Sequence, residues 1–242
     1  MERKIAGLFD LDGVILDTED FYSQFWGEQG RLYCPEIPDF TAKVKGRTLS
    51  DLLTTYFPGK EQAETIIRKL GDFERQMPFR FIAGADGFIR DLKAHGVKLA
   101  IVTSSNDAKM AEVYRVLPQL KEWFDVIVTA DKITRSKPAP ECYLLAAEEL
   151  QYTSARCIVF EDSFSGIEAG KRAGMKVIGL ATTNSADYFY IFSDSTRLKI
   201  LCALCSMELC VGDLSYILNL NQTTISHQLK LLRDNKIVGC RR

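Results

Sequence analysis

Five short apolar segments recur along the first three quarters of the chain, and longer stretches of mixed polarity separate them. The segments are residues 5–9, 97–102, 124–129, 155–160 and 175–180. Each has the length of a buried strand and is bounded by polar or turn-forming residues. Apolar positions between them follow helical spacing. The alternation predicts an α/β fold with a Rossmann-like parallel sheet and helices on both faces.

Two other regions lack this alternation and are predicted to be helical. Residues 18–77 contain aromatic side chains near helical spacing, and prolines interrupt them, which favours a helical insertion after the first strand. Near the carboxyl terminus, residues 191–201, 208–214 and 221–233 read as three short amphipathic helices. The last of these has an apolar face formed by Ile225, Leu229 and Leu232.

Residues that can take part in catalysis or bind a ligand follow the predicted strands. They are, in chain order, Asp10 and Asp12, then Thr103 and Ser104, then Lys137, and finally Glu161 and Asp162. The carboxyl ends of parallel strands meet at one edge of a sheet, and ligands bind beyond that edge. The sequence therefore predicts that these distant groups converge on one site.

The types of residue at this edge predict phosphoryl transfer. Four acids and one lysine would repel one another without a hard divalent cation, and Mg²⁺ prefers such oxygen ligands. Thr103 and Ser104 can donate hydrogen bonds to phosphate, and Lys137 supplies a fixed positive charge. Asp10 would attack phosphorus, and Asp12 would act as general acid and then general base.

Composition narrows the setting without identifying a partner. The formal net charge of -1 gives no overall attraction to nucleic acid or to anionic membranes. Seven scattered cysteines are an odd number and do not form a disulfide framework. No apolar run approaches the roughly 18 residues of a membrane span. We therefore expect a cytoplasmic protein that does not contact membranes.

Four motifs resemble those of the haloacid dehalogenase (HAD) superfamily. They are residues 9–19, 103–105, 137–141 and 161–163, and the resemblance covers residues 4–186. The most similar subgroup contains β-phosphoglucomutase and sugar-phosphate phosphatases, which carry a helical cap after the first motif. The resemblance implies that Asp10 is the nucleophile and Asp12 the acid/base. It further implies that Asp10, the Asp12 carbonyl and Asp162 hold Mg²⁺, and that Glu161 is either a further ligand or supports the ligands from behind. Thr103, Ser104 and Lys137 are implied to bind phosphate.

Three further residues are candidates for shaping the substrate pocket. Asn106 follows the second motif. The mutase has a histidine near the position of Tyr22, and it has an arginine two positions from Arg47. Tyr22 and Arg47 are as consistent with core packing as with substrate contact. Because the histidine is missing, a phosphatase is favoured over a mutase.

The carboxyl-terminal helices resemble the winged-helix repressors of the ArsR/SmtB family. The similarity is carried by residues 194–201 and 224–233 and extends over residues 190–242. It implies a recognition helix whose outer face is Gln222, Thr223, Ser226 and His227. A small helical subdomain with an ordinary polar face explains the same pattern. The family's soft-metal pair is incomplete, since Cys210 is present but Gly212 replaces the second cysteine.

The chain is thus expected to consist of two parts. Residues 1–187 are predicted to form the HAD-like domain, in which segments 1–17 and 83–187 make the core and residues 18–82 make the cap. Residues 188–242 are predicted to form a truncated helix-turn-helix module. The β-wing and the dimerising helix of the repressor family are missing, which predicts weak DNA binding. We expect a Mg²⁺-dependent phosphatase of a small phosphorylated metabolite, most simply a sugar phosphate. The alternatives are a phosphosugar mutase, a regulator with a HAD sensor, or a junction of two unrelated reading frames.

Overall fold

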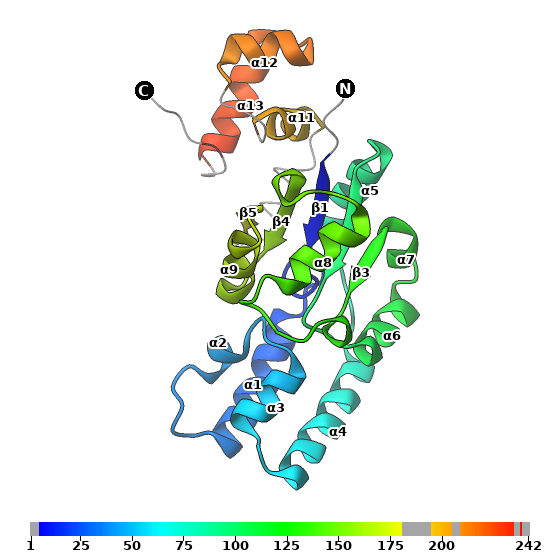
Figure 1. The fold of residues 1–242 in the computed structure, drawn as a ribbon, viewed down its shortest axis with the longest axis vertical. Helices are drawn as coiled ribbons and strands as arrows, with labels where there is room; N and C mark the ends of the chain where they lie inside the picture. The colour runs from blue at the N-terminus through cyan, green and yellow to red at the C-terminus, as the bar shows by residue number, and fades with distance from the viewer. Residues whose placement is uncertain (1–4, 181–194, 205–208, 235–237, 239–242) are drawn as a thin grey trace.

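A parallel five-stranded sheet forms the centre of the chain (Figure 1). The structure is a computed structural model, and it describes residues 5–180, 195–204, 209–234 and 238. The strand order is β3-β2-β1-β4-β5, with β1 in the middle. The strands are β1 (Ala6–Phe9), β2 (Lys98–Val102), β3 (Val126–Val128), β4 (Cys157–Glu161) and β5 (Lys176–Gly179).

Each face of the sheet is covered by its own set of helices. Neighbouring residues of a strand point to opposite faces, so Phe9 packs on one side and Leu8 on the other. The Phe9 side is covered by α5 (Ala85–Ala94), α6 (Asp107–Val116) and α7 (Leu120–Trp123). The Leu8 side is covered by α8 (Glu141–Leu150) and α9 (Phe164–Arg172). Short 3₁₀ turns, η1 (Ala130–Lys132) and η2 (Ser154–Arg156), lie in the connections.

Four helices form a separate cap beyond the carboxyl ends of the strands (Figure 1). They are α1 (Glu19–Tyr33), α2 (Phe40–Val44), α3 (Leu49–Tyr56) and α4 (Lys60–Gln76). Aromatic rings fill the core of the cap, where Phe25, Trp26, Phe40 and Phe57 are all buried. The Trp26 and Phe57 rings stack with centroids 6.3 Å apart. The cap thus has its own small core and can cover the end of the sheet as a unit.

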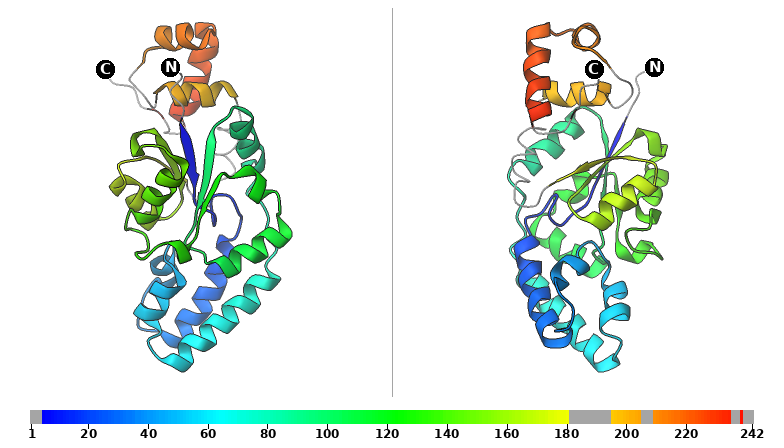
Figure 2. Two further views of the ribbon diagram at one scale, coloured as in Figure 1. Left: turned by 45° about the vertical axis from the view of Figure 1, so that its right-hand side comes forward. Right: turned by 90° about the vertical axis from the view of Figure 1, so that its left-hand side faces the viewer.

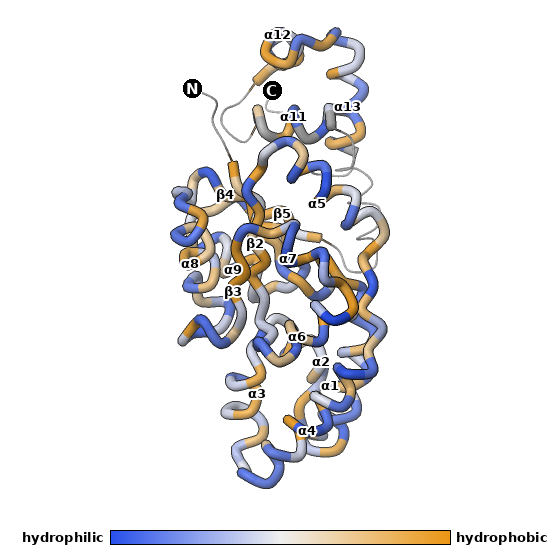
Figure 3. Tube along the Cα trace, turned by 90° about the vertical axis from the view of Figure 1, so that its right-hand side faces the viewer, coloured by the Kyte–Doolittle hydropathy of each residue, from blue (hydrophilic) through white to orange (hydrophobic). Residues whose placement is uncertain are grey.

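The carboxyl-terminal helices lie at the opposite end of the molecule from the cap (Figures 1 and 2). They are α11 (Ser195–Leu204), α12 (Val211–Leu218) and α13 (Gln222–Asp234). Ile200, Leu214, Ile225 and Leu232 are fully buried where the three helices meet. Leu201 packs both on this cluster and on the core of the sheet domain. Apolar stretches alternate with polar ones along these helices, as Figure 3 shows.

The structure confirms the predicted fold class and all five predicted strands. It also confirms the inward face of the last helix, because Ile225 and Leu232 are buried and Leu229 is partly buried. The predicted start of the second short helix is wrong. Leu209 and Cys210 are not helical, and α12 begins at Val211 because Cys210 caps it. Residues 191–194 and 208 of the predicted helices lie outside the described residues.

Candidate active site

A cleft of about 340 Å³ separates the carboxyl edge of the sheet from the cap. Both sides contribute to it, because the core supplies the ends of β1, β2 and β4 and the cap supplies α1, α4 and the segment after α2. The residues that line it and bear on its chemistry are Asp10, Asp12, Glu19, Tyr22, Lys45, Glu74, Thr103, Ser104, Asn106, Lys109 and Asp162.

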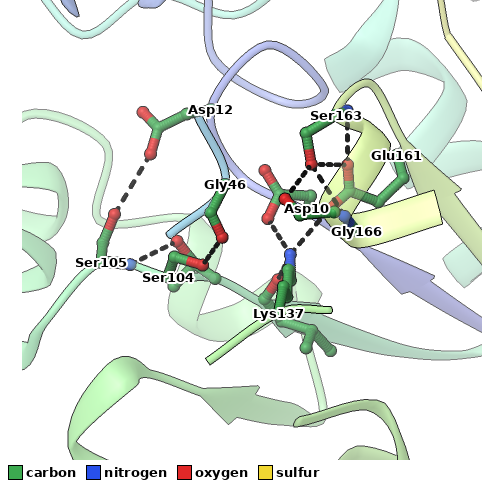
Figure 4. Close-up of polar contacts among 12 residues, drawn as sticks. Asp10, Asp12, Gly46, Ser104, Ser105, Lys137, Glu161, Ser163 and Gly166 are labelled. Carbon is green, nitrogen blue, oxygen red and sulfur yellow. Dashed lines mark hydrogen bonds and ion pairs between the residues drawn. The ribbon is translucent and has the colours of Figure 1, made fainter. Parts of the chain in front are cut away.

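Lys137 joins two carboxylates beneath the floor of this cleft. Its ammonium lies 2.5 Å from Asp10 Oδ1 and 2.7 Å from Glu161 Oε1, and it also donates to the Val102 carbonyl at 3.2 Å (Figure 4). The Lys137 side chain is only 1% exposed. Asp10 directly follows β1, Glu161 ends β4, and Lys137 lies between β3 and α8. Three distant segments therefore meet around one ammonium group.

Burial and charge act against each other in this cluster. Burial disfavours the Lys137 ammonium, but Asp10 and Glu161 outweigh that effect and hold the pKa of Lys137 well above its usual value. The pKa of Asp10 is raised by burial and by the nearby charges of Glu161 and Asp162, although Lys137 lowers it. For Glu161, Lys137 and neighbouring hydrogen bonds outweigh burial and lower the pKa. Negative charge is thus in excess around Asp10.

The Glu161 carboxylate is held in place by hydrogen bonds from residues at the start of α9. Its Oε2 accepts hydrogen bonds from the backbone N–H groups of Asp162 and Ser163, both at 2.8 Å, and from Ser163 Oγ at 2.9 Å. The same Ser163 hydroxyl caps α9 by accepting from Gly166 N–H at 3.0 Å. A Cβ at Gly166 would lie 1.6 Å from Glu161 Oε1. Glycine is therefore required there to admit the carboxylate.

The Asp12 carboxylate points away from Asp10 (Figure 4). Thr18 donates a hydrogen bond to Asp12 Oδ1 at 2.6 Å, and Ser105 Oγ donates to Oδ2 at 3.1 Å. The Lys109 ammonium forms an ion pair with the same Oδ2. Each of the two aspartates thus has its own lysine partner, Lys109 for Asp12 and Lys137 for Asp10.

Asp162 is paired with a lysine of the cap. The Lys45 ammonium lies 2.8 Å from Asp162 Oδ2 and 2.8 Å from Glu19 Oε2. Burial raises the pKa of Asp162 to about 7, although Lys45 opposes this shift. The backbone of the same cap segment is fixed to the core, because Ser165 Oγ donates to the Lys45 carbonyl at 3.3 Å. Lys45 thus links the cap to the acidic cluster.

The predicted phosphate-binding hydroxyls lie on the core side of the cleft. Thr103 is buried, and its Oγ1 accepts a hydrogen bond from Ser105 N–H at 3.0 Å. Ser104 Oγ donates to the Gly46 carbonyl of the cap at 2.7 Å (Figure 4). Asn106 caps α6, since its Oδ1 accepts from Lys109 N–H at 2.9 Å. The structure therefore brings these residues to the cleft and gives Ser104 and Asn106 structural contacts as well.

The two cap candidates occupy different surroundings. Tyr22 lines the cleft and donates a hydrogen bond to Glu74 Oε1 at 2.8 Å. Arg47 borders the cleft, but its guanidinium is bound to Asp51, Tyr56 and Thr55 of α3.

The sequence did not point to two lysines that contact the acids of the site, Lys45 and Lys109. Lys45 lies two positions before Arg47, and Lys109 is the third residue after the Asn106 cap, yet neither place in the sequence signals a contact with an acid.

The acidic cluster fits a magnesium ion. Among the described residues, no three His, Cys, Asp or Glu side chains are arranged to hold a metal by themselves. Mg²⁺ is commonly bound by one or two carboxylates, with water and substrate phosphate completing its shell. Asp10 and Asp162, with the Asp12 carbonyl, would supply such oxygen donors. Burial is the largest cause of the raised pKa of Asp10 and of Asp162, and neighbouring carboxylates add to it, so a cation bound here would stabilise both carboxylates.

The predicted recognition residues lie on the outer face of α13. Gln222, Thr223, Ser226 and His227 are all exposed. Cys210 is also exposed, and its sulfur accepts a hydrogen bond from Asp213 N–H at the start of α12. The Cys210 thiol is thus a helix cap.

Two families match this chain over separate segments. Haloacid dehalogenase-like hydrolases match residues 7–180, and bacterial regulatory proteins of the arsR family match residues 194–238. The curated relatives include phosphatases of phosphorylated carbohydrates and β-phosphoglucomutases.

Three individual comparisons show how far the similarity extends. A phosphorylated carbohydrates phosphatase of Thermotoga maritima is 32% identical over 72% of this chain and 83% of its own length. A bifunctional riboflavin kinase/FMN phosphatase of Arabidopsis thaliana is 31% identical over 80% of this chain, which spans only 53% of that longer protein. The crystal structure of a HAD hydrolase of family IA, variant 3, from Entamoeba histolytica has a TM-score of 0.62 at 28% identity. It covers 74% of this chain and 84% of its own.

Within the described ranges, no helix combines the length and the apolar character needed to cross a bilayer.

Proposed function

Because the chain belongs to the haloacid dehalogenase-like hydrolases, we propose that it is a phosphatase of small phosphorylated metabolites that works through a phosphorylated Asp10. One observation carries the proposal. The Asp10 carboxylate lies at the base of a cleft, and a buried lysine within 2.5 Å fixes its position. A nucleophile held in this way loses little freedom when substrate binds.

In the first half-reaction, Asp10 and Asp12 act on opposite sides of the phosphorus atom. An Asp10 oxygen forms a bond to phosphorus while the bond from phosphorus to the ester oxygen breaks. Asp12 gives its proton to the departing oxygen, so that an alcohol leaves. Lys137 and the hydroxyls of Thr103 and Ser104 would stabilise the charge on the phosphoryl oxygens.

In the second half-reaction, water removes the phosphoryl group from Asp10. Asp12, now ionised, takes a proton from the water as the water oxygen bonds to phosphorus. The bond between phosphorus and the Asp10 oxygen breaks, and inorganic phosphate leaves. The cycle restores both aspartates to their starting states.

Magnesium is the proposed cofactor. When bound, it would neutralise charge on the transferring phosphoryl group. Asp10, Asp162 and the Asp12 carbonyl are the groups that would hold it, with Glu161 supporting from below. Glu161 is committed to Lys137 and to the start of α9, so we assign it to holding the cluster together.

A phosphatase explains the cap better than a mutase does. A mutase must return the phosphoryl group to its sugar and exclude water during the exchange. The position that resembles the mutase histidine is Tyr22, and its hydroxyl is already bound to Glu74. The relatives contain both activities, so the mutase is the alternative. The names of those relatives favour a sugar phosphate as substrate, and we expect the enzyme to act in the cytoplasm.

A panel of phosphate esters tests the function. The chain is incubated with sugar phosphates, FMN and nucleotides in the presence of Mg²⁺, and released phosphate is measured. We expect release from at least one small ester, and loss of release in Asp10→Asn. Removal of Mg²⁺ with EDTA should also stop turnover. Interconversion of sugar phosphates without release would favour the mutase, and no reaction with any ester would refute both.

A second function, DNA binding, is favoured by the match of residues 194–238 to arsR-family regulators. The exposed polar face of α13 suits contact with a major groove. A gel-shift series on palindromic duplexes at increasing salt tests it. Binding that weakens with salt and is lost in His227→Ala would support a regulator. The absence of a shift at low salt would leave the helical module without a role in DNA recognition.

A further inference from the structure

Lys109 occupies the junction between the core and the cap. It lies in the first turn of α6, and its side chain is only 4% exposed. The ammonium forms an ion pair with Asp12 Oδ2, and it lies 4.4 Å from the centroid of the Tyr22 ring. A buried ammonium without such partners would be costly. The two contacts show that Lys109 is built into the cleft.

The cap side of this junction is also a connected set of contacts. Tyr22 belongs to α1, and its hydroxyl donates to Glu74 Oε1 of α4 at 2.8 Å. Glu74 is 9% exposed. Burial raises its pKa, and the positive charge of Lys109 partly offsets that effect. Helices α4 and α6 adjoin here, as Figure 1 shows. Lys109 therefore faces two cap residues on one side and the acid/base on the other.

The other two hydrogen-bond partners of Asp12 do not connect its carboxylate to the cap helices. Ser105 belongs to the core, and Thr18 precedes α1 at the hinge between core and cap. Among the described contacts of the Asp12 carboxylate, only Lys109 also touches the face of a cap aromatic ring. When the cap lifts, Lys109 would lose the Tyr22 ring, and the carboxylate would lose a fixed neighbour.

We propose that Lys109 is a positioning residue that holds Asp12 in its working orientation, and that Tyr22 and Glu74 hold Lys109 while the cap covers the cleft. The inference rests on the proposed phosphatase function and adds residues to it. Its consequence is that the acid/base is aligned in the closed cleft and loosened in the open one.

Substitution of Lys109 tests the proposal on the whole chain. Lys109→Met removes the charge at similar length, and Lys109→Arg keeps it. Lys121→Met is the control, because the Lys121 ammonium also lies over a tyrosine ring, that of Tyr114 at 4.6 Å, but on the surface. With the preferred sugar phosphate, Lys109→Met should lower kcat about 100-fold and leave KM within a few-fold, the cost typical of a misplaced catalytic group. Lys109→Arg should recover part of the loss, and the control should match the unmodified chain.

A second ester separates positioning from a folding defect. The leaving group of p-nitrophenyl phosphate departs with little need for a proton. In Lys109→Met, the initial burst of nitrophenol should therefore stay fast, while the later steady rate, which needs Asp12 as base, falls. With the sugar phosphate, both phases should slow. A protein that is merely misfolded in part would show a smaller burst with unchanged rates for both esters, and that result would overturn the proposal.

Two changes at Tyr22 test the cap side. Tyr22→Phe keeps the ring over Lys109 and should cost less than about threefold in kcat, whereas Tyr22→Leu removes the ring and should approach the loss of Lys109→Met. Equal effects of the two Tyr22 changes would contradict the role of the ring. An unchanged kcat in Lys109→Met, or a rise in KM alone, would overturn the positioning role, the latter by making Lys109 a substrate contact. No turnover by the unmodified chain would instead remove the proposed function, and this inference with it.

Discussion

The Lys137 ammonium and the Asp10 carboxylate lie 2.5 Å apart, although 127 positions separate them along the chain. Asp10 follows the central strand, and Lys137 lies in the connection between the edge strand β3 and α8. The carboxylate of Glu161, at the end of β4, accepts a hydrogen bond from the same ammonium group. The parallel sheet is the scaffold that makes this possible, because it brings the ends of separate strands to one edge.

Removal of Lys137 should abolish activity and destabilise the fold. Lys137→Met leaves Asp10 and Glu161 buried without their cation, which typically lowers the free energy of unfolding by about 3–5 kcal/mol. The double variant Lys137→Met, Glu161→Gln should regain part of that stability in urea denaturation and remain inactive. Lys132→Met, which loses only an exposed pair with Glu149, is the control. Equal stability of the single variant and the control would contradict the account.

The glycine beside Glu161 should tolerate no side chain. In Gly166→Ala, the new methyl group would collide with the Glu161 carboxylate, so we expect at least a tenfold loss of kcat and a lower Tm. Gly87→Ala is the matched change, because a Cβ at Gly87 meets nothing within 4 Å. It should leave kcat unchanged and raise Tm slightly through its helix propensity. Similar kinetics in both variants would show that Glu161 has more room than the structure gives it.

Asp125 should make stability depend on acid pH. Burial alone would raise the pKa of Asp125, but Lys98, the Leu99 N–H and Lys93 outweigh it and lower the pKa. A lowered folded pKa stabilises the fold above the unfolded pKa of about 3.9, and the stabilisation is lost as pH falls through the folded value. Asp125→Asn should thus have a lower Tm than the unmodified chain at pH 7, with the gap closing below about pH 4. A gap that stays constant over this range would rule out the effect.

The stability of α12 should depend on the residue at position 210, because the Cys210 thiol caps its first turn. Serine is a stronger cap than a thiol, so Cys210→Ser should stabilise the helical module, whereas Cys210→Ala should weaken it. The two variants should differ by about 0.5–2 kcal/mol in the stability of that unit. Circular dichroism during heating would measure this. A thiophilic metal such as Zn²⁺ should leave the melting of the unmodified module unchanged, and a large shift would contradict the assignment of Cys210 as a cap.

The strands and the convergence of their ends could be predicted, because buried parallel strands have a strong local pattern and their ends must meet. The orientation of Asp12 could not. Its direction depends on Lys109, whose position is set by how α6 packs on α4 of the cap. Lys45 was missed for a similar reason. It reaches Asp162 only because the cap segment is hydrogen-bonded to Ser104 and Ser165 of the core. Contacts between segments that are distant in the sequence cannot be predicted from the local pattern of either segment.

The most direct test of the central claim is to trap the phosphoryl group on the protein. The chain is mixed with a ³²P-labelled ester and Mg²⁺, quenched in acid within the first turnover, and digested, and the labelled peptide is identified. We predict label on the peptide that contains Asp10, and none in Asp10→Asn. Release of labelled phosphate with no label on the protein, together with an active Asp10→Asn variant, would contradict this prediction.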